Sequence, residues 1–205
     1  MSSPGTVALV DYGAGNLRSV ENALREVGAR VLVTRDPAAV ARADRVVVPG
    51  QGSMPECALA MQKSGVAEAL VLAISRGRPV LGICVGLQLL FEDGEEAGGA
   101  RGLGILPGRI EKLPSSVKLP HIGWSPVRLV GERPALFAPL DGQYLYFAHS
   151  YAAPADAAGA ALLATHGRPY CAALARENLF ATQFHPEKSQ RFGLALISNF
   201  LKWKP

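Results

Sequence analysis

The sequence predicts an α/β fold: a mostly parallel central sheet flanked by helices, with an antiparallel extension and a small second sheet. In the first half of the chain, short runs of Val, Leu and Ile alternate with segments of helical periodicity, which is typical of a parallel sheet covered on both faces. The second half consists of strand-like segments joined by Gly, Pro and Asn turns. The 205 residues contain no internal repeat or linker, so we expect a single domain over residues 1–205.

The first half is expected to contain four strands, each followed by a helix. Continuous apolar runs place the strands at residues 6–13, 29–35, 45–50 and 78–84. The helices are expected at residues 16–28, 36–43, 54–75 and 85–91. The first helix carries apolar residues at helical spacing and stops at Gly28, and the second has Asp36 as N-cap and Pro37 at its first position.

The second half is expected to supply the antiparallel strands and a closing helix. The strand-like segments are residues 102–114, 125–132, 144–151, 160–167 and 170–184. Glu177 and Asn178 predict a hairpin turn inside the last of these segments. Residues 189–203 have the amphipathic pattern of a helix.

The composition narrows the classes of protein. With 49% hydrophobic residues, 19% charged residues and a net charge of +4 spread along the chain, the sequence favours a globular protein and predicts no nucleic-acid partner. No apolar stretch has the length of a membrane span and no basic region precedes the first apolar run, so we expect no membrane contact and a cytoplasmic location. Cys57, Cys84 and Cys171 are too few and too scattered for a disulfide framework or a zinc site, which leaves a reactive thiol to consider.

Cys84 has the setting of a nucleophile on a sharp turn. A buried strand ends there, a helix is expected to follow, and Gly82 and Gly86 remove side chains that would collide in a tight turn. The dipole of the helix would favour the thiolate, and the backbone N–H of Val85 would be free to stabilise an oxyanion. The same five residues are also compatible with a buried cysteine beside incidental glycines.

Of the four histidines, only His185 has a neighbour that could orient it as a general base. Residues 180–189 predict a strand that ends at this histidine, and side chains two apart in an extended chain share a face, so Glu187 would lie beside the ring. Pro186 stiffens the segment. Alone, a His-x-Glu pair is more often a surface coincidence; beside the cysteine it predicts a triad with Cys84.

A third segment, Pro49-Gly50-Gln51-Gly52, follows the third strand. Two glycines at a strand end allow backbone amides to turn toward a ligand. Ligands bind beyond the carboxyl ends of parallel strands, so this turn and Cys84 should meet at one rim of the sheet. Alone, the segment is a plain turn; next to Cys84 it predicts oxyanion donors.

Together, PGQG (49–52), GICVG (82–86) and HPEKS (185–189) resemble the motifs of the class I, triad-type glutamine amidotransferases. The resemblance implies the fold of that family, which has a flavodoxin-like core, and it implies glutaminase chemistry. Cys84 would attack the side-chain amide of glutamine, form a glutamyl thioester and release ammonia, with His185 and Glu187 completing the triad. No cofactor and no metal is implied.

The resemblance also assigns substrate-binding positions. The backbone donors to the oxyanion would come from Gly50, Gln51, Gly52 and Val85, foremost Gln51 and Val85. Gln88, one helical turn after the cysteine, would face the same pocket, and Glu96 would pair with the substrate ammonium, although the run EDGEE offers other acidic candidates. A backbone edge at His149, Ser150 and Tyr151 would complete the pocket.

A longer set of segments resembles one branch of the family, the glutaminase subunits of imidazole glycerol phosphate synthases. DYGAGNLRSV (11–20), HIGWSPV (121–127), YFAHSY (146–151) and FHPEKSQRFG (184–193) carry this resemblance along essentially the whole chain. It implies a heterodimer with a (β/α)8-barrel cyclase that receives ammonia from the active-site rim and acts in histidine biosynthesis. The matching interface positions are Asn16, His121, Trp124 and Lys188.

Other interpretations are compatible with the motifs. A glutaminase subunit of pyridoxal phosphate or anthranilate synthesis shares the triad and differs in its partner. A cysteine hydrolase of the same elbow architecture would act on peptides or small amides, and a non-catalytic binding module would not need the triad. The sequence departs from the family pattern at Gln51, where a small apolar residue is usual, and at Val85, where Leu is common.

Overall fold

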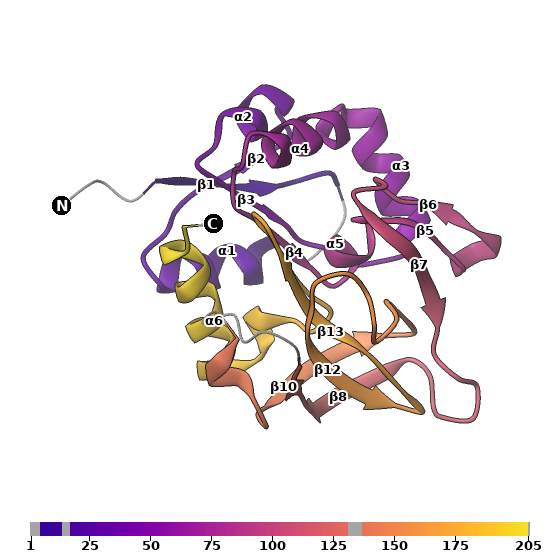
Figure 1. Cartoon of the computed structure of the whole chain (residues 1–205). Coiled ribbons are helices and arrows are strands. Elements are labelled where there is room, and N and C mark those ends of the chain that lie inside the picture. Colours follow the sequence, from indigo (N-terminus) through magenta and orange to yellow (C-terminus); the bar gives the residue numbers. More distant parts are fainter. Residues whose placement is uncertain (1–4, 14–16, 131–136, 205) are drawn as a thin grey trace.

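An eight-stranded sheet forms the centre of the computed structural model, which describes residues 5–13, 17–130 and 137–204 (Figure 1). The strand order is β2 (Arg30–Thr34), β1 (Thr6–Val10), β3 (Arg45–Val48), β4 (Val80–Ile83), β14 (Leu179–Thr182), β13 (Arg168–Arg176), β12 (Ala160–His166) and β9 (Arg128–Leu129). Neighbours from β2 to β14 are parallel, and the last three strands are antiparallel. The predicted parallel sheet with an antiparallel extension is therefore confirmed.

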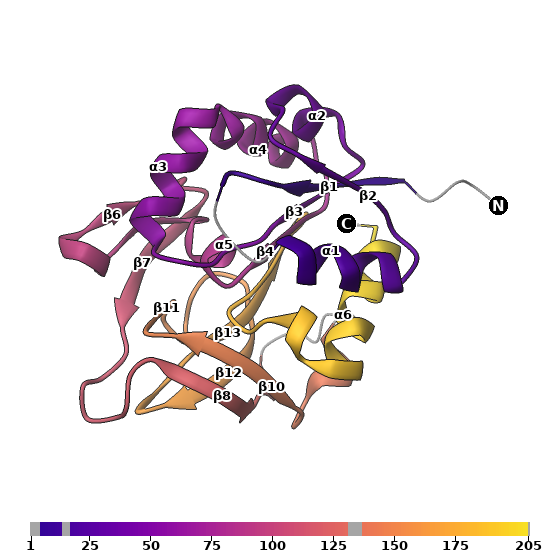
Figure 2. The same ribbon diagram turned by 180° about the vertical axis from the view of Figure 1, so that it is seen from behind.

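Helices cover both faces of the parallel strands (Figures 1 and 2). One face carries α1 (Leu17–Glu26) and α6 (Gln190–Lys202), and the other carries α2 (Pro37–Arg42), α3 (Met54–Ser64) and α4 (Val66–Ser75). Gly65 lies between α3 and α4 with φ 71, so the predicted helical stretch 54–75 is bent there by 87°. Within the described part of the chain, no single helix is long and apolar enough to cross a membrane, and only this bent pair meets that criterion jointly.

The predicted small second sheet is present, and a two-stranded ribbon accompanies it. The small sheet has the order β11 (Tyr151–Ala152), β7 (Leu106–Lys112), β5 (Phe91–Gly94) and β6 (Ala100–Arg101), and the ribbon pairs β10 (Tyr144–His149) with β8 (His121–Pro126). The predicted hairpin turn is confirmed as well, because Arg176 pairs with Leu179 across Glu177 and Asn178.

The helix that follows Cys84 is shorter than predicted. α5 covers only Val85–Gln88, whereas the sequence predicted a helix over residues 85–91. Sheet-type pairing competes with the helix beyond this point: Leu103 N–H donates to the Leu89 carbonyl at 2.8 Å, and Leu106 N–H donates to the Leu90 carbonyl at 2.8 Å. The chain therefore leaves the helix and enters β5.

The strands β3, β4 and β14 lie side by side and bring the sequence motifs to one edge of the sheet. The Cys84 N–H continues the ladder by donating to the Thr182 carbonyl at 2.7 Å. All three strands end at this rim, as the parallel pairing requires.

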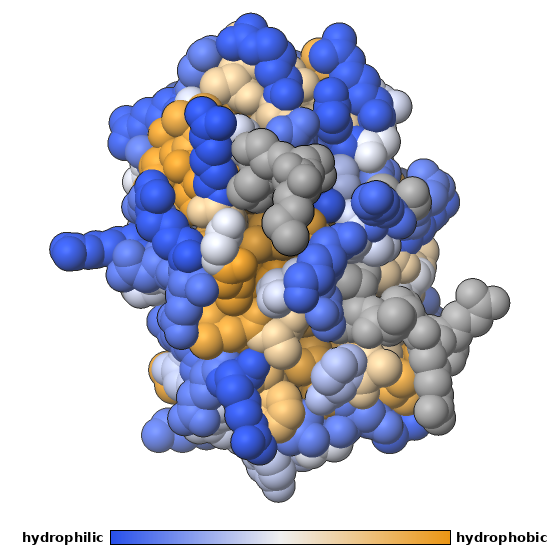
Figure 3. Space-filling model, turned by 90° about the vertical axis from the view of Figure 1, so that its left-hand side faces the viewer, coloured by the Kyte–Doolittle hydropathy of each residue, from blue (hydrophilic) through white to orange (hydrophobic). Residues whose placement is uncertain are grey.

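On the side of the molecule where β1 begins, a band of apolar residues is bordered by hydrophilic ones (Figure 3).

The backbone approach at Gly86 predicts a specific stability loss. A Cβ atom at Gly86 would run into the Val48 carbonyl oxygen, so Gly86→Ala must push β3 and the turn apart. We expect it to lower the free energy of unfolding by at least about 2 kcal/mol, measured by chemical denaturation. Ser75→Ala, at the exposed end of α4, should change it by less than about 0.5 kcal/mol. Equal stability of the two variants would contradict the close approach.

Candidate active site

Cys84 lies on a strained turn between β4 and α5. Its φ of 54° and ψ of −109° are unusual for a residue with a side chain, and such strain concentrates at functional sites. A Cβ on Gly82 would lie 2.6 Å from the Gly86 carbonyl oxygen, and a Cβ on Gly50 would lie 2.5 Å from the Gly86 nitrogen. The two glycines that flank the cysteine are thus required by close backbone contacts, and the segment 49–52 packs directly on the turn.

The short α5 changes the predicted electrostatics. A helix of one turn has only a small macrodipole. The predicted stabilisation of a Cys84 thiolate by the helix dipole is therefore weak. The Val85 N–H still has no acceptor within the helix, because Val85 is its first residue. A backbone donor therefore remains next to the sulfur, while stabilisation of the thiolate must come from side chains.

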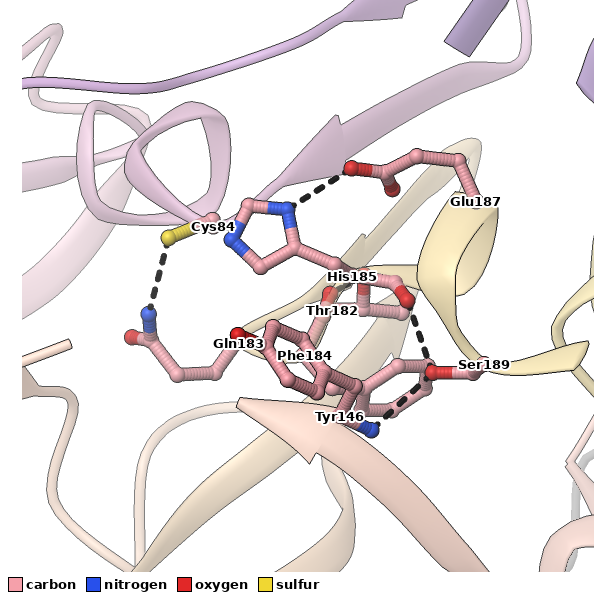
Figure 4. A network of polar contacts seen from close by, with 8 residues as sticks. All are labelled: Cys84, Tyr146, Thr182, Gln183, Phe184, His185, Glu187 and Ser189. Carbon is pink, nitrogen blue, oxygen red and sulfur yellow. Dashed lines mark hydrogen bonds and ion pairs between the residues drawn. The ribbon is translucent and has the colours of Figure 1, made fainter. Parts of the chain in front are cut away.

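His185 connects Cys84 with Glu187 (Figure 4). Its Nδ1 lies 2.8 Å from Glu187 Oε1, both side chains are buried, and the other ring nitrogen faces the sulfur. The pairing agrees with the sequence prediction, but the predicted extended conformation is wrong. β14 ends at Thr182, and residues 186–188 form a 3₁₀ turn, η3 (Pro186–Lys188), which folds Glu187 back toward the ring.

The charge on the imidazole is stabilised by its two neighbours. Burial by itself lowers the pKa of His185, but the hydrogen bonds to Cys84 and Glu187 outweigh it and raise this pKa to about 10. At neutral pH the ring is therefore an imidazolium between a carboxylate and the sulfur. This arrangement stabilises a thiolate and holds a proton ready for a leaving group.

A cavity of about 440 Å³ opens at the sulfur. It is lined by Gly50, Gln51, Gly52, Cys84, Val85, Gln88, Glu96, Pro120, Ala148, His149, Ser150, Tyr151, His185 and Lys188. The structure thus brings together every residue that the sequence analysis named for oxyanion or substrate binding, together with Cys84, His185 and Lys188; Pro120 and Ala148 are the lining residues that the sequence analysis did not name. Glu187 lies behind His185 and does not line the cavity.

Glu96 and His149 both line this cavity and differ in charge. Glu96 Oε2 accepts a hydrogen bond from the Met54 N–H at 2.7 Å, which selects this carboxylate from the acidic run 92–96. His149 Nδ1 lies 2.9 Å from the Tyr151 carbonyl oxygen, which can only accept, so Nδ1 carries the proton. Burial lowers the pKa of His149 to about 3, although the bond to Tyr151 opposes this shift. The ring is therefore neutral.

Two buried groups that the sequence analysis did not use hold the segment 49–52 from below. The Tyr12 hydroxyl donates to the Pro49 carbonyl, and Cys57 Sγ donates to the Gln51 carbonyl at 3.4 Å. Burial raises the pKa of Tyr12 and of Cys57, so both remain protonated donors at neutral pH. Carbonyl anchors on both sides of Gly50 limit how this turn can move.

Gln183 is a further residue that the sequence analysis missed. Its side chain is completely buried, and its Nε2 lies 3.6 Å from Cys84 Sγ (Figure 4). Its Oε1 accepts from Gln88 Nε2 at 3.2 Å. Gln183 lies just beyond the end of β14, where the alternation of side chains in a strand no longer applies, so no sequence pattern marked it.

The predicted interface residues differ in exposure. Trp124 is 44% exposed on the ribbon and contacts the Tyr146 ring edge-on at 6.0 Å, and Lys188 Nζ lies 5.5 Å from the centre of that ring. His121 is 6% exposed and stacks on Phe147, so its side chain offers almost no surface to a partner. Asn16 lies outside the described residues.

Comparisons with known proteins identify the family that the chain resembles. The family "Glutamine amidotransferase class-I" matches residues 8–203. Two similar curated proteins are called "Imidazole glycerol phosphate synthase subunit HisH". The protein from Nitrosomonas europaea is 48% identical, and the match covers 98% of this chain and 99% of the relative. The protein from Syntrophotalea carbinolica is 46% identical, and the match covers 95% of this chain and 98% of the relative. A chain from "Structure of PurLQS from Thermotoga maritima" shares the fold, with a TM-score of 0.76 at 19% identity. The match covers 98% of this chain and 99% of that chain.

The raised pKa of His185 predicts a pH dependence of stability. Because the pKa rises from 6.5 to about 10 on folding, the stabilisation is complete below pH 6.5 and is lost as the pH approaches 10. Between these limits the free energy of unfolding should fall more in the wild type than in His185→Gln, by more than about 1 kcal/mol in a denaturant titration. Parallel curves for the two proteins would show that the ring is not charged in the folded state.

Proposed function

The chain belongs to the class-I glutamine amidotransferases, and we propose that it is the glutaminase subunit of an imidazole glycerol phosphate synthase. One observation carries the chemistry: the strained Cys84 and the His185 ring line a cavity of about 440 Å³, and the buried Glu187 carboxylate lies behind that ring, 2.8 Å from its Nδ1. The curated relatives, which match over nearly the whole chain, support the assignment to that synthase.

The reaction starts at the sulfur of Cys84. Its thiolate attacks the side-chain amide carbon of glutamine, and the amide oxygen becomes an oxyanion. The Val85 N–H and an amide of the turn 50–52, foremost that of Gln51, stabilise this charge. His185 then donates its proton to the leaving nitrogen, so ammonia departs and a glutamyl thioester remains.

The second half of the reaction reuses the same groups. The imidazole, now neutral, accepts a proton from a water molecule that attacks the thioester, and glutamate leaves. Glu187 holds the ring in the tautomer that directs its other nitrogen to the sulfur and stabilises the charge when the proton returns. The carboxylate is thus an orienting group and exchanges no proton with substrate.

The cavity supplies the groups that recognise glutamine. Glu96 is fixed by the Met54 N–H and would pair with the α-ammonium of the substrate. The backbone at residues 149–151 forms another part of the lining, and Gln88 Nε2 donates to the Tyr151 carbonyl there at 3.0 Å.

Ammonia must reach a synthase before it meets bulk water, which favours docking at the cavity rim. We place a (β/α)8-barrel cyclase there, in a heterodimer. Trp124, Tyr146 and Lys188 form a continuous group beside the cavity, and the exposed Ile122 and Tyr144 extend it along the ribbon. Exposed aromatic and apolar side chains of this kind are typical anchors of protein interfaces.

Removal of the nucleophile tests the chemistry. Cys84→Ala should reduce glutamine hydrolysis by the complex by about 10³-fold or more, because the thioester cannot form. Glu187→Gln should reduce it less, by about 10- to 10³-fold, since only orientation and charge of His185 are disturbed. The measurement is glutamate release in the presence of the cyclase and its ligand. Hydrolysis at the wild-type rate in Cys84→Ala would refute the mechanism.

Partner dependence tests the assignment to this synthase. Glutamine hydrolysis should be weak for the isolated chain and should rise strongly with a (β/α)8-barrel cyclase and its ribulose-phosphate ligand. Trp124→Ala should raise the cyclase concentration needed for half-maximal stimulation by about 10-fold or more. Leu72→Ala, an exposed apolar residue on α4, is the matched control and should leave it unchanged. Hydrolysis that ignores the cyclase would instead indicate a different synthase.

A further inference from the structure

A chain of three hydrogen bonds connects the backbone of β11 with the nucleophile. The Tyr151 carbonyl accepts from Gln88 Nε2 at 3.0 Å, Gln88 Nε2 also donates to Gln183 Oε1 at 3.2 Å, and Gln183 Nε2 lies 3.6 Å from Cys84 Sγ. Gln183 is completely buried and Gln88 is 3% exposed. No solvent therefore competes for these amides.

The chemistry of its first member sets the direction of the whole chain. A carbonyl oxygen can only accept, so Gln88 must present its NH₂ group to Tyr151. The second N–H of that group then points at Gln183 and requires an acceptor, which can only be Oε1. It follows that the Gln183 side chain presents its NH₂ group, and not its oxygen, to the sulfur.

The position of Gln183 in the fold reinforces this orientation. Its backbone N–H donates to the Ala172 carbonyl of β13 at 2.8 Å, so the residue is fixed in the sheet. The side chain approaches the sulfur from one side, while the His185 ring approaches from another (Figure 4). Cys84 Sγ therefore has two neighbouring groups that favour a negative sulfur, and the one-turn helix α5 adds little.

We propose that Gln183 is a functional residue of the site in addition to the triad, which donates an N–H to the Cys84 sulfur, stabilises the thiolate and holds it toward the cavity. Gln88 is then a positioning residue, because it acts on the sulfur through Gln183. An N–H donor forms a stronger hydrogen bond with a thiolate than with a thiol, because the bond is charge-assisted only when the sulfur is ionised. The donor therefore shifts the equilibrium of the thiol toward the thiolate. The inference rests on the proposed function, in which this thiolate attacks glutamine.

Alkylation of Cys84 by iodoacetamide tests the inference without glutamine or a partner. The thiolate displaces iodide, and the rate as a function of pH reports the fraction ionised; Cys84→Ala identifies the signal. Gln183→Met keeps the length of the side chain but removes the donor. We expect the pH of half-maximal alkylation to rise by about 1 to 2 units. Gln183→Asn, which withdraws the amide by one methylene, should give a shift in the same direction and covers the case that Gln183→Met does not fold.

Thr182→Val is the matched control. Thr182 is equally buried on β14, and its hydroxyl donates to the Phe184 carbonyl at 3.0 Å, away from the sulfur. Its loss should leave the alkylation profile unchanged. A wild-type profile in both folded Gln183 variants, or an equal shift in Thr182→Val, would overturn the role of Gln183. Failure of the proposed function would appear separately, as glutamine hydrolysis that survives Cys84→Ala.

Discussion

The close approach of β3 to the turn after β4 is the constraint on which the site depends. The Val48 carbonyl leaves no room for a side chain at Gly86, and Gly50 packs against the same turn. This contact accompanies the strained backbone of Cys84, with φ 54° and ψ −109°, and places the turn 50–52 next to its side chain. The proposed nucleophile and the proposed oxyanion donors are thus brought together by backbone packing.

Buried hydrogen bonds then set the protonation states around the sulfur. His185 is desolvated, yet its pKa is raised, because the Cys84 and Glu187 contacts outweigh the cost of burial. The Tyr151 carbonyl oxygen orients two uncharged side chains. It fixes the tautomer of His149 and the direction of the Gln88 amide, because both groups must donate to it. One backbone oxygen on β11 therefore orders both a wall of the cavity and the amides that lead to the sulfur.

The sequence was sufficient for the sheet and for the elements that carry the site. Continuous apolar strands predicted the parallel sheet, and of the two interpretations of the glycines around Cys84 the structure supports the tight turn, because a Cβ at Gly82 or Gly86 would collide with backbone. The end of α5 could not be predicted, because it depends on pairing of residues 89–90 with residues 103–106, a contact that no local pattern encodes. Local periodicity also missed the 3₁₀ turn at 186–188, although the pairing of His185 with Glu187 survived. Gln183 was missed because an amide just beyond a strand end carries no chemical signature until its neighbours are known.

The central claim is that Cys84, in this strained and charged setting, forms the covalent bond to glutamine. The most direct measurement is mass spectrometry of the complex after reaction with a glutamine analogue that carries a diazoketone in place of the amide. The account predicts one label per chain, attached to the peptide that contains Cys84 and blocked by excess glutamine. A label on Cys57 or Cys171, or none while glutamine is still hydrolysed, would contradict it.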